Sequence, residues 1–207
     1  MLTKHGIPVS RGVAIGPGIV FGKEKFKISN KFVCVKAVDS EVVRFRCALE
    51  GVCRELAETQ KQANERLGVK YGAIFGAHLE MARDSKLIDE IETLIRKRRN
   101  SPESAVRKVL KGYAKELQSL GATYLSERAT DMFDLEKSIL RHLMGEEREE
   151  LSQLLEPVIV LAFNLTPSET ASLDRRNVKA FVTESGGPTS HTAILAGALE
   201  IPAVVGV

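Results

Sequence analysis

Apolar residues recur at helical spacing over a long stretch in the first third of the chain. From Asp39 to Leu67 the steps between them alternate between three and four positions, which places them on one face of an α-helix. Asp39 or Ser40 stands just before the first of them and is suited to cap the helix. This stretch is therefore predicted to be a long amphipathic helix with inward positions Val42, Phe45, Leu49, Val52 and Leu56.

Four more segments with helical periodicity follow. We expect helices over Tyr71–Arg83 and Ser85–Arg98, and a fourth that begins at Ser101–Pro102, with serine as N-cap and proline as the first helical residue. A fifth spans about Tyr124–Leu143 and stops at Gly145, a good C-terminal signal. Five amphipathic helices with short connections predict a helical bundle with its own core.

Strand character flanks the helical block on both sides. Residues 6–22 are rich in glycine, valine and isoleucine, which indicates short β-segments broken by turns. Further strands are predicted at Lys31–Val35, Pro157–Leu161, Val178–Val182 and Ile201–Gly206. The simplest architecture is an α/β domain, residues 1–36 and 146–207, interrupted by an inserted all-α helical bundle domain, residues 37–145.

Composition and charge narrow the classes of function. The formal net charge of +3 is too small to indicate nucleic-acid binding, and the basic run Arg96–Arg99 ends a helical pattern, where the dipole favours cations. No stretch of about 20 apolar residues occurs, so we expect no membrane partner. Cys34, Cys47 and Cys53 form no Cys-x-x-Cys pair, which predicts a protein of the reducing cytoplasm without a structural metal site.

The clearest chemical signal lies near the end of the chain. Gly186 and Gly187 let the backbone approach a ligand closely, and Thr189 and Ser190 are good helix caps, so His191 is expected in the first turn of an apolar helix. A helix N-terminus favours an anion. Histidine ordinarily titrates near pH 6.5, so a neutral imidazole is available there to accept a phosphoryl group. The plainer alternative is a turn and a helix cap with an incidental histidine.

These residues resemble enzyme I of the bacterial phosphoenolpyruvate:sugar phosphotransferase system over the whole chain. The stretches Leu165–Ala171, Gly186–Ile194 and Glu200–Gly206 are similar to its phosphohistidine domain, also called the swivelling domain. The stretches Ala73–His78 and Tyr124–Asp131 are similar to its helical domain. The glycine–histidine motif alone is shared with pyruvate phosphate dikinase and phosphoenolpyruvate synthase.

The resemblance implies a set of roles and partners. His191 accepts phosphate from phosphoenolpyruvate and gives it to HPr, the histidine phosphocarrier protein that docks on the helical domain. Thr170 hydrogen-bonds the His191 imidazole. The carboxy-terminal domain that binds phosphoenolpyruvate and Mg²⁺ and dimerises lies beyond Val207, so the present chain is expected to be monomeric, to hold no cofactor and to be unable to use phosphoenolpyruvate alone.

The sequence departs from the family pattern at two kinds of position. Pro188 and Gly197 stand where the family commonly has arginine. The helical region expected to face HPr carries His78 and the cations Lys70, Arg83 and Lys86, and it is less acidic than the family pattern. His78 has an interface role or is a simple surface residue.

Two other functions remain open from the sequence. The chain could be the swivelling module of a dikinase or of a phosphoenolpyruvate synthase relative. It could also be a non-catalytic, carrier-binding regulatory module in which His191 no longer turns over.

Overall fold

The computed structural model describes residues 3–22, 26, 28, 32–121, 123–146 and 156–207. The chain divides into two compact units that are each discontinuous in sequence. The first consists of Met1–Lys25, Thr59–Phe75 and Glu149–Val207, and the second of Phe26–Glu58 and Gly76–Arg148. None of the helices in the described residues combines the length and the apolar character that crossing a membrane needs.

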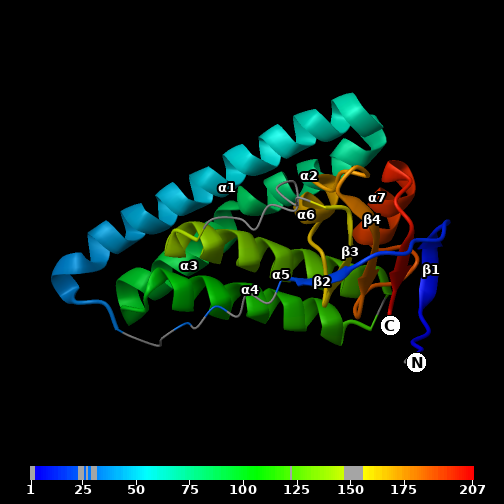
Figure 1. Ribbon diagram of the computed structural model, residues 1–207. Helices are drawn as coiled ribbons and strands as arrows, with labels where there is room; N and C mark the ends of the chain where they lie inside the picture. The colour runs from blue at the N-terminus through cyan, green and yellow to red at the C-terminus, as the bar shows by residue number, and fades with distance from the viewer. Residues whose placement is uncertain (1–2, 23–25, 27, 29–31, 122, 147–155) are drawn as a thin grey trace. The chain divides into compact units, whose positions relative to one another are not determined.

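The first unit is built on a five-stranded sheet in the order β1-β5-β4-β3-β2 (Figure 1). Strands β2 to β5 are parallel to their neighbours, whereas β1 pairs with β5 in the antiparallel sense. Helix α6 connects β3 to β4, and helix α7 connects β4 to β5, as parallel pairing requires. The elements are β1 (Ile7–Ser10), β2 (Gly18–Phe21), β3 (Val158–Ala162), α6 (Pro167–Ala171), β4 (Val178–Thr183), α7 (His191–Leu199) and β5 (Ala203–Val205).

One face of this sheet forms the core of the first unit. Val160 and Phe181 are fully buried there, in a cluster with Ala196 and Leu199 of α7. The other face is apolar but partly exposed. Its cross-strand neighbours Val20 and Leu161 are 58% and 38% exposed.

The second unit is a bundle of long helices. Its core joins all five helices of the block through buried apolar side chains such as Phe45, Leu79, Ile91, Leu110 and Ile139. The helices are α1 (Val38–Leu67), α2 (Val69–Ala82), α3 (Ser85–Arg98), α4 (Pro102–Ser119) and α5 (Thr123–Met144).

The predicted fold class is confirmed, and most predicted elements are found within a few residues of their expected bounds. Ser101 caps α4 through a hydrogen bond that its side chain accepts from the Ser104 amide, and Pro102 opens the helix. Gly145 has a φ of 65° directly after α5, as the C-terminal signal predicted.

The strand predicted at Lys31–Val35 is wrong over the residues described. Phe32 makes only an isolated bridge with Asn100, and Val35 begins a 3₁₀ helix, Val35–Ala37. The Val33 amide donates to the Arg99 carbonyl at 2.7 Å. The segment therefore pairs with the end of a helix, where no strand is available to extend a ladder.

The division into compact units differs from the predicted inserted block 37–145. Residues 59–75, which include the end of α1 and the start of α2, group with the sheet. Ala63 and Phe75 are buried there in a cluster with Leu195 of α7. The predicted boundary at 146 adjoins residues 147–155, which lie outside the described part of the chain.

Candidate functional site

The predicted glycine loop leaves the carboxyl end of β4 and enters α7. The amides of Glu184 and Ser185 donate to the carbonyls of Ala162 and Phe163, which fastens the start of the loop to the end of β3. Gly186 has a φ of 120°, and a Cβ at this position would lie 3.4 Å from that of Val205. That distance is an ordinary contact, so glycine is favoured here by the backbone conformation and not by lack of space. The loop lies where ligands bind in open α/β sheets, beyond the carboxyl ends of the strands.

Ser190 is the N-cap of α7, and His191 is the first residue of the helix. The Ser190 side chain accepts a hydrogen bond from the Ala193 amide at 3.2 Å. Since the serine oxygen acts as acceptor in this bond, its own hydroxyl proton can be donated to a ligand oxygen. The first-turn amides of an α-helix have no intrahelical acceptors, so His191 sits at the positive end of the dipole.

Thr170 is fully buried in the short helix α6. A capping box opens this helix, because Glu169 accepts from the Thr166 amide at 2.8 Å and donates its own amide to the Thr166 hydroxyl. The Thr170 hydroxyl donates to the Thr166 carbonyl at 2.9 Å. With its proton used in this way, the Thr170 oxygen can act toward an imidazole only as an acceptor.

Thr192 is a buried residue of the site that the sequence reasoning did not single out. Its hydroxyl donates to the Leu165 carbonyl at 3.0 Å and so ties the first turn of α7 to the chain entering α6. The segments that carry Thr170 and His191 are therefore fixed to each other within one unit. The place of Thr192 directly after His191 was the sequence signal that could have identified it, but only the fold shows that its side chain points inward.

The chain around His191 is almost without cationic groups. Between Ala180 and Val207 the sequence holds Glu184 and Glu200 but no lysine or arginine. Arg175 precedes this segment in the sequence, and it forms an ion pair with Glu200 at 2.7 Å. Gly197 is exposed on α7, and a Cβ there would meet no atom within 4 Å. The donors that this segment itself offers to an anion are therefore neutral groups and the positive end of the helix dipole.

The predicted partner-binding residues fall in different parts of the molecule. Lys70 is exposed and belongs to the first unit, whereas Arg83 and Lys86 are exposed in the second. Lys86 lies 4.0 Å from Glu90 and over the Tyr113 ring. His78 is 5% exposed, with its Nε2 atom 3.1 Å from Asp131, so it is not a simple surface residue.

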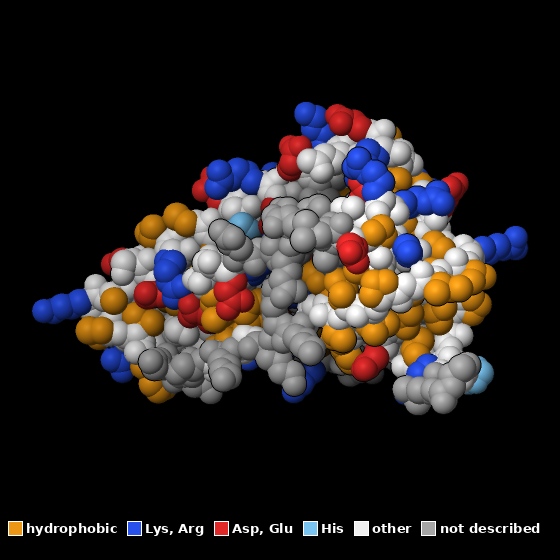
Figure 2. Space-filling view, in the orientation of Figure 1, with side chains coloured by type: hydrophobic (Ala, Val, Ile, Leu, Met, Phe, Trp, Pro, Cys, Tyr) orange, Lys and Arg blue, Asp and Glu red, His pale blue; other side chains and the backbone are white. Residues whose placement is uncertain are grey.

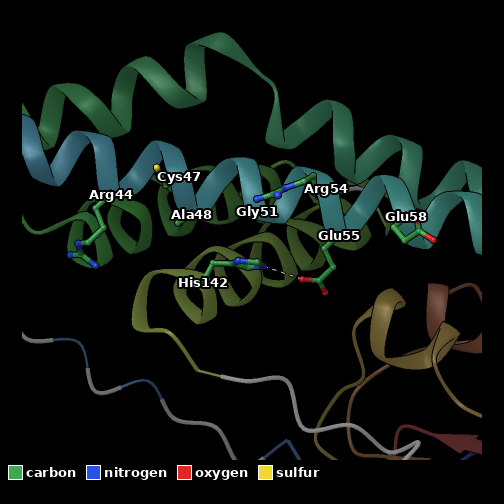
Figure 3. A pocket seen from close by; sticks show the side chains of 8 residues that line it. All are labelled: Arg44, Cys47, Ala48, Gly51, Arg54, Glu55, Glu58 and His142. Carbon is green, nitrogen blue, oxygen red and sulfur yellow. Dashed lines mark hydrogen bonds and ion pairs between the residues drawn. The ribbon is translucent and has the colours of Figure 1, made fainter.

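A groove of about 620 Å³ runs along α1 in the second unit (Figure 3). His142 of α5 points across it to Glu55, with 3.0 Å between Nε2 and the carboxylate. Arg141 binds the same carboxylate oxygen. None of the predicted site residues lines this groove, and its Glu55, His142 and Arg44 are engaged in contacts that join α1 to α5 and α4. We therefore assign it a structural role.

Comparison with known proteins places the chain in a family. The model for the N-terminal domain of PEP-utilising enzymes matches residues 5–128, and that for their mobile domain matches residues 154–207. The chain therefore belongs to the PEP-utilising enzymes. Within them, the resemblance to the amino-terminal part of enzyme I is confirmed by both relatives and structures.

Similar proteins named phosphoenolpyruvate-protein phosphotransferase include those of Mycoplasma capricolum and Listeria innocua. That of Mycoplasma capricolum is 35% identical over 201 residues, which are 97% of this chain and 35% of that protein. That of Listeria innocua is 39% identical over the same shares of both chains. The present chain thus spans about a third of the length of the curated relatives it matches.

Two solved structures are similar in fold. The NMR solution structure of Enzyme I (nEIt) has a TM-score of 0.78 and 40% sequence identity, and the match covers 97% of this chain and 81% of that one. The N-terminal domain of Enzyme 1 - Nitrogen has a TM-score of 0.68 and 26% identity, with 97% and 82% covered.

Proposed function

We propose that this chain carries a phosphoryl group on His191 and passes it to HPr, the carrier protein of the sugar phosphotransferase system. The observation that carries the proposal is the place of His191, at the first position of α7 behind a serine cap and a glycine loop. A phosphoryl group needs little covalent assistance from a protein, but it needs a positioned nucleophile and donors for its oxygens.

The hydroxyl groups of the site suit two different tasks in this reaction. The Thr170 oxygen accepts the N–H of the imidazole, which leaves the lone pair on the opposite ring nitrogen. That lone pair forms the N–P bond as the bond from phosphorus to the donor atom breaks. The N–H on the other ring nitrogen remains hydrogen-bonded to the Thr170 oxygen. The hydroxyls of Ser190 and Thr189, with the Gly187 amide and the amides of His191 and Thr192 in the first turn of α7, donate to the phosphoryl oxygens. The Ser190 and Ala193 amides are already engaged.

The source of the phosphoryl group is proposed to be phosphoenolpyruvate, bound with Mg²⁺ by a carboxy-terminal domain of the full-length enzyme. The name of the relatives supports this donor, and we propose that the donor site belongs to the part of those proteins that the present chain does not match. We therefore expect no phosphate uptake from phosphoenolpyruvate and Mg²⁺ by residues 1–207 alone.

The decisive experiment runs the transfer backwards. Phosphorylated HPr is mixed with the chain, and the product is tested for phosphate that is labile in acid and stable in base. We expect incorporation by the native chain and none by His191→Ala. The exposed His5→Ala variant is the matched control and should accept phosphate normally. Full incorporation by His191→Ala would exclude His191 as the acceptor.

Binding and turnover are separated by a second measurement. If the chain binds HPr but takes up no phosphate, it acts as a carrier-binding module without catalysis. Calorimetry at rising salt tests the binding step, and a basic carrier should bind more weakly as salt rises. Arg83→Glu should strengthen binding several-fold if the carrier covers that residue, whereas the exposed Arg54→Glu on α1 should leave it unchanged.

A further inference from the structure

Basic residues gather at the end of the bundle where α3 stops. Lys97, Arg98 and Arg99 are all exposed, and Lys36 at the start of the α1 region is exposed as well. Arg99 follows the last helical residue and adopts a left-handed conformation, with φ at 55° and its amide bonded to the Leu94 carbonyl. Glycine is the residue that this backbone position favours.

Two exposed apolar side chains lie beside these cations. The chain at Phe32 runs antiparallel to the helix end, since Phe32 bridges Asn100 and the Val33 amide donates to Arg99. Phe32 is 76% exposed and Val35 is 68% exposed. The end of the bundle at which α1 begins, at the left of Figure 1, shows blue and orange side chains next to each other in Figure 2.

We call Phe32, Val35, Lys36, Lys97, Arg98 and Arg99 the basic tip. Arg96 directly precedes these cations in α3, but acidic side chains of α1 and α3 compensate its charge. Arg96 forms an ion pair with Asp39 at 2.6 Å and lies 3.9 Å from Glu92. Among the residues that the structure describes, no ion pair is recorded for the three cations that follow Arg96. The tip therefore presents uncompensated positive charge around exposed apolar groups.

The helix dipole explains only part of this arrangement. Cations in the last turn of α3 are stabilised by the negative end of the helix. Arg99 lies beyond that turn, at a position where an arginine side chain strains the backbone and the folded chain gains no recorded ion pair from it. Binding of an anionic partner would explain the arginine at position 99, which contacts within the folded chain do not explain.

We propose that the basic tip docks the protein on the surface of a membrane that contains anionic lipids. Cations that flank exposed aromatic and aliphatic side chains suit the interface, where the charges meet lipid phosphates and the apolar groups enter the headgroup boundary. The expectation of no membrane partner rested on the lack of a spanning segment, and peripheral docking needs none. Nucleic acid is disfavoured, since the cations are confined to a small end of the bundle instead of following a groove or strand.

The test is cosedimentation of the whole chain with vesicles. Vesicles of phosphatidylcholine with a quarter phosphatidylglycerol should bind the chain at low salt, and vesicles of pure phosphatidylcholine should not. Removal of each cation is expected to weaken binding about fivefold. Lys97→Glu/Arg98→Glu should therefore abolish it, while Lys61→Glu/Lys115→Glu, with the same change in charge at exposed positions elsewhere, should retain it.

Two further variants separate docking from folding. Arg99→Gly removes a cation but relieves the left-handed backbone, so it should weaken vesicle binding without lowering the melting temperature. Phe32→Ser should weaken binding and leave its salt dependence in place. The proposal is overturned if anionic vesicles fail to bind the native chain, if both charge-reversal pairs behave alike, or if a short RNA duplex binds through the tip and vesicles do not.

Discussion

At the residue scale, a single hydrogen bond sets the role that is open to each of two threonines, Thr170 and Thr192. Both are buried threonines whose hydroxyls donate to backbone carbonyls, at 2.9 Å and 3.0 Å. Thr170 was predicted as a partner of the histidine from its motif, and that role stays a prediction. The sequence did not indicate that the Thr170 oxygen would be an acceptor toward the imidazole. That role follows from the folded chain, which brings the Thr166 carbonyl to the Thr170 hydroxyl as its acceptor.

Thr170→Val is predicted to slow phosphoryl transfer several-fold. The valine keeps the shape but removes the acceptor for the imidazole N–H, which costs on the order of 1 kcal/mol. The Thr166 carbonyl keeps the Thr170 amide as a donor at 2.9 Å, so the fold should persist. Rapid-quench transfer from phosphorylated HPr across pH 6–9 measures the effect, and Thr170→Ser should restore the rate.

Thr192→Val is the matched control for this prediction. It removes a buried hydroxyl of the same kind, leaves the Leu165 carbonyl without this donor, and should lower stability by about 1 kcal/mol. Its transfer rate should show the native dependence on pH. Equal pH profiles for both valine variants would mean that Thr170 acts only by supporting the fold.

At the scale of elements, the sequence predicted those features that depend on neighbouring residues, such as the ends of helices. The N-cap at Ser101 and the helix stop at Gly145 were predicted correctly, because each depends on residues within a few positions. The predicted strand Lys31–Val35 failed because a strand needs a neighbour, and the fold provides only the end of α3. The contact of His142 with Glu55, 87 positions apart, had no sequence signal.

Gly51→Ala is predicted to destabilise the bundle by about 1–3 kcal/mol. A Cβ at Gly51 would lie 2.7 Å from Nδ1 of His142, where α1 and α5 approach each other. Gly112→Ala in α4 is the control, because a Cβ there meets nothing within 4 Å and alanine favours the helix by up to about 1 kcal/mol. Urea unfolding of both variants measures the two changes in the free energy of unfolding, which should have opposite signs. An equal change in both would refute the close approach of α1 and α5 at Gly51.

The contact of Arg44 with Glu103 makes the joint between α1 and α4 sensitive to acid. The two side chains are 2.7 Å apart. Burial is the largest single effect on the pKa of the Glu103 carboxyl and raises it. The hydrogen bonds from Arg44, Ser101 and the backbone amide, together with the charge of Arg44, outweigh burial, so the pKa lies below its usual value. A carboxyl with a lowered pKa in the folded state adds stability above its unfolded pKa, and this contribution is lost as the pH falls.

Glu103→Gln is therefore predicted to lower stability at pH 7 by on the order of 1 kcal/mol and to have a smaller effect at pH 3. Urea unfolding at both pH values provides the measurement. The exposed Glu116→Gln on the same helix should shift neither value by more than about 0.5 kcal/mol. A Glu103→Gln effect that grows toward low pH would contradict the sign.

At the scale of the whole molecule, the sequence pattern indicates the fold class but does not show which residues of a long helix share a core. The change from strand to helical periodicity indicated an α/β part and a helical part, which the fold contains. Periodicity cannot show that a continuous helix contributes to two cores. Ala63 and Phe75 follow the same helical pattern as their neighbours, and only tertiary packing assigns them to the cluster with Leu195.

Phe75→Ala is predicted to destabilise the first unit by about 3–5 kcal/mol, since Phe75 is fully buried. Hydrogen exchange of β4 and α7 reports on this unit and should show faster exchange in the variant. Phe133→Ala, at a partly exposed position of α5, is the control and should leave exchange in β4 and α7 unchanged. Unchanged protection in Phe75→Ala would place this residue outside the core of the sheet unit.

The sharing of α1 and α2 between two units constrains how the gene for such a protein can be recombined. Exchange of the bundle between relatives at 37 and 145, in the connections, would set a foreign Ala63 and Phe75 against the native Leu195. Crossover points inside the helices, after Glu58 and before Gly76, keep each core with its own partners. Chimeras joined within helices should therefore fold more often than chimeras joined in loops, contrary to the usual practice of cutting where secondary structure ends.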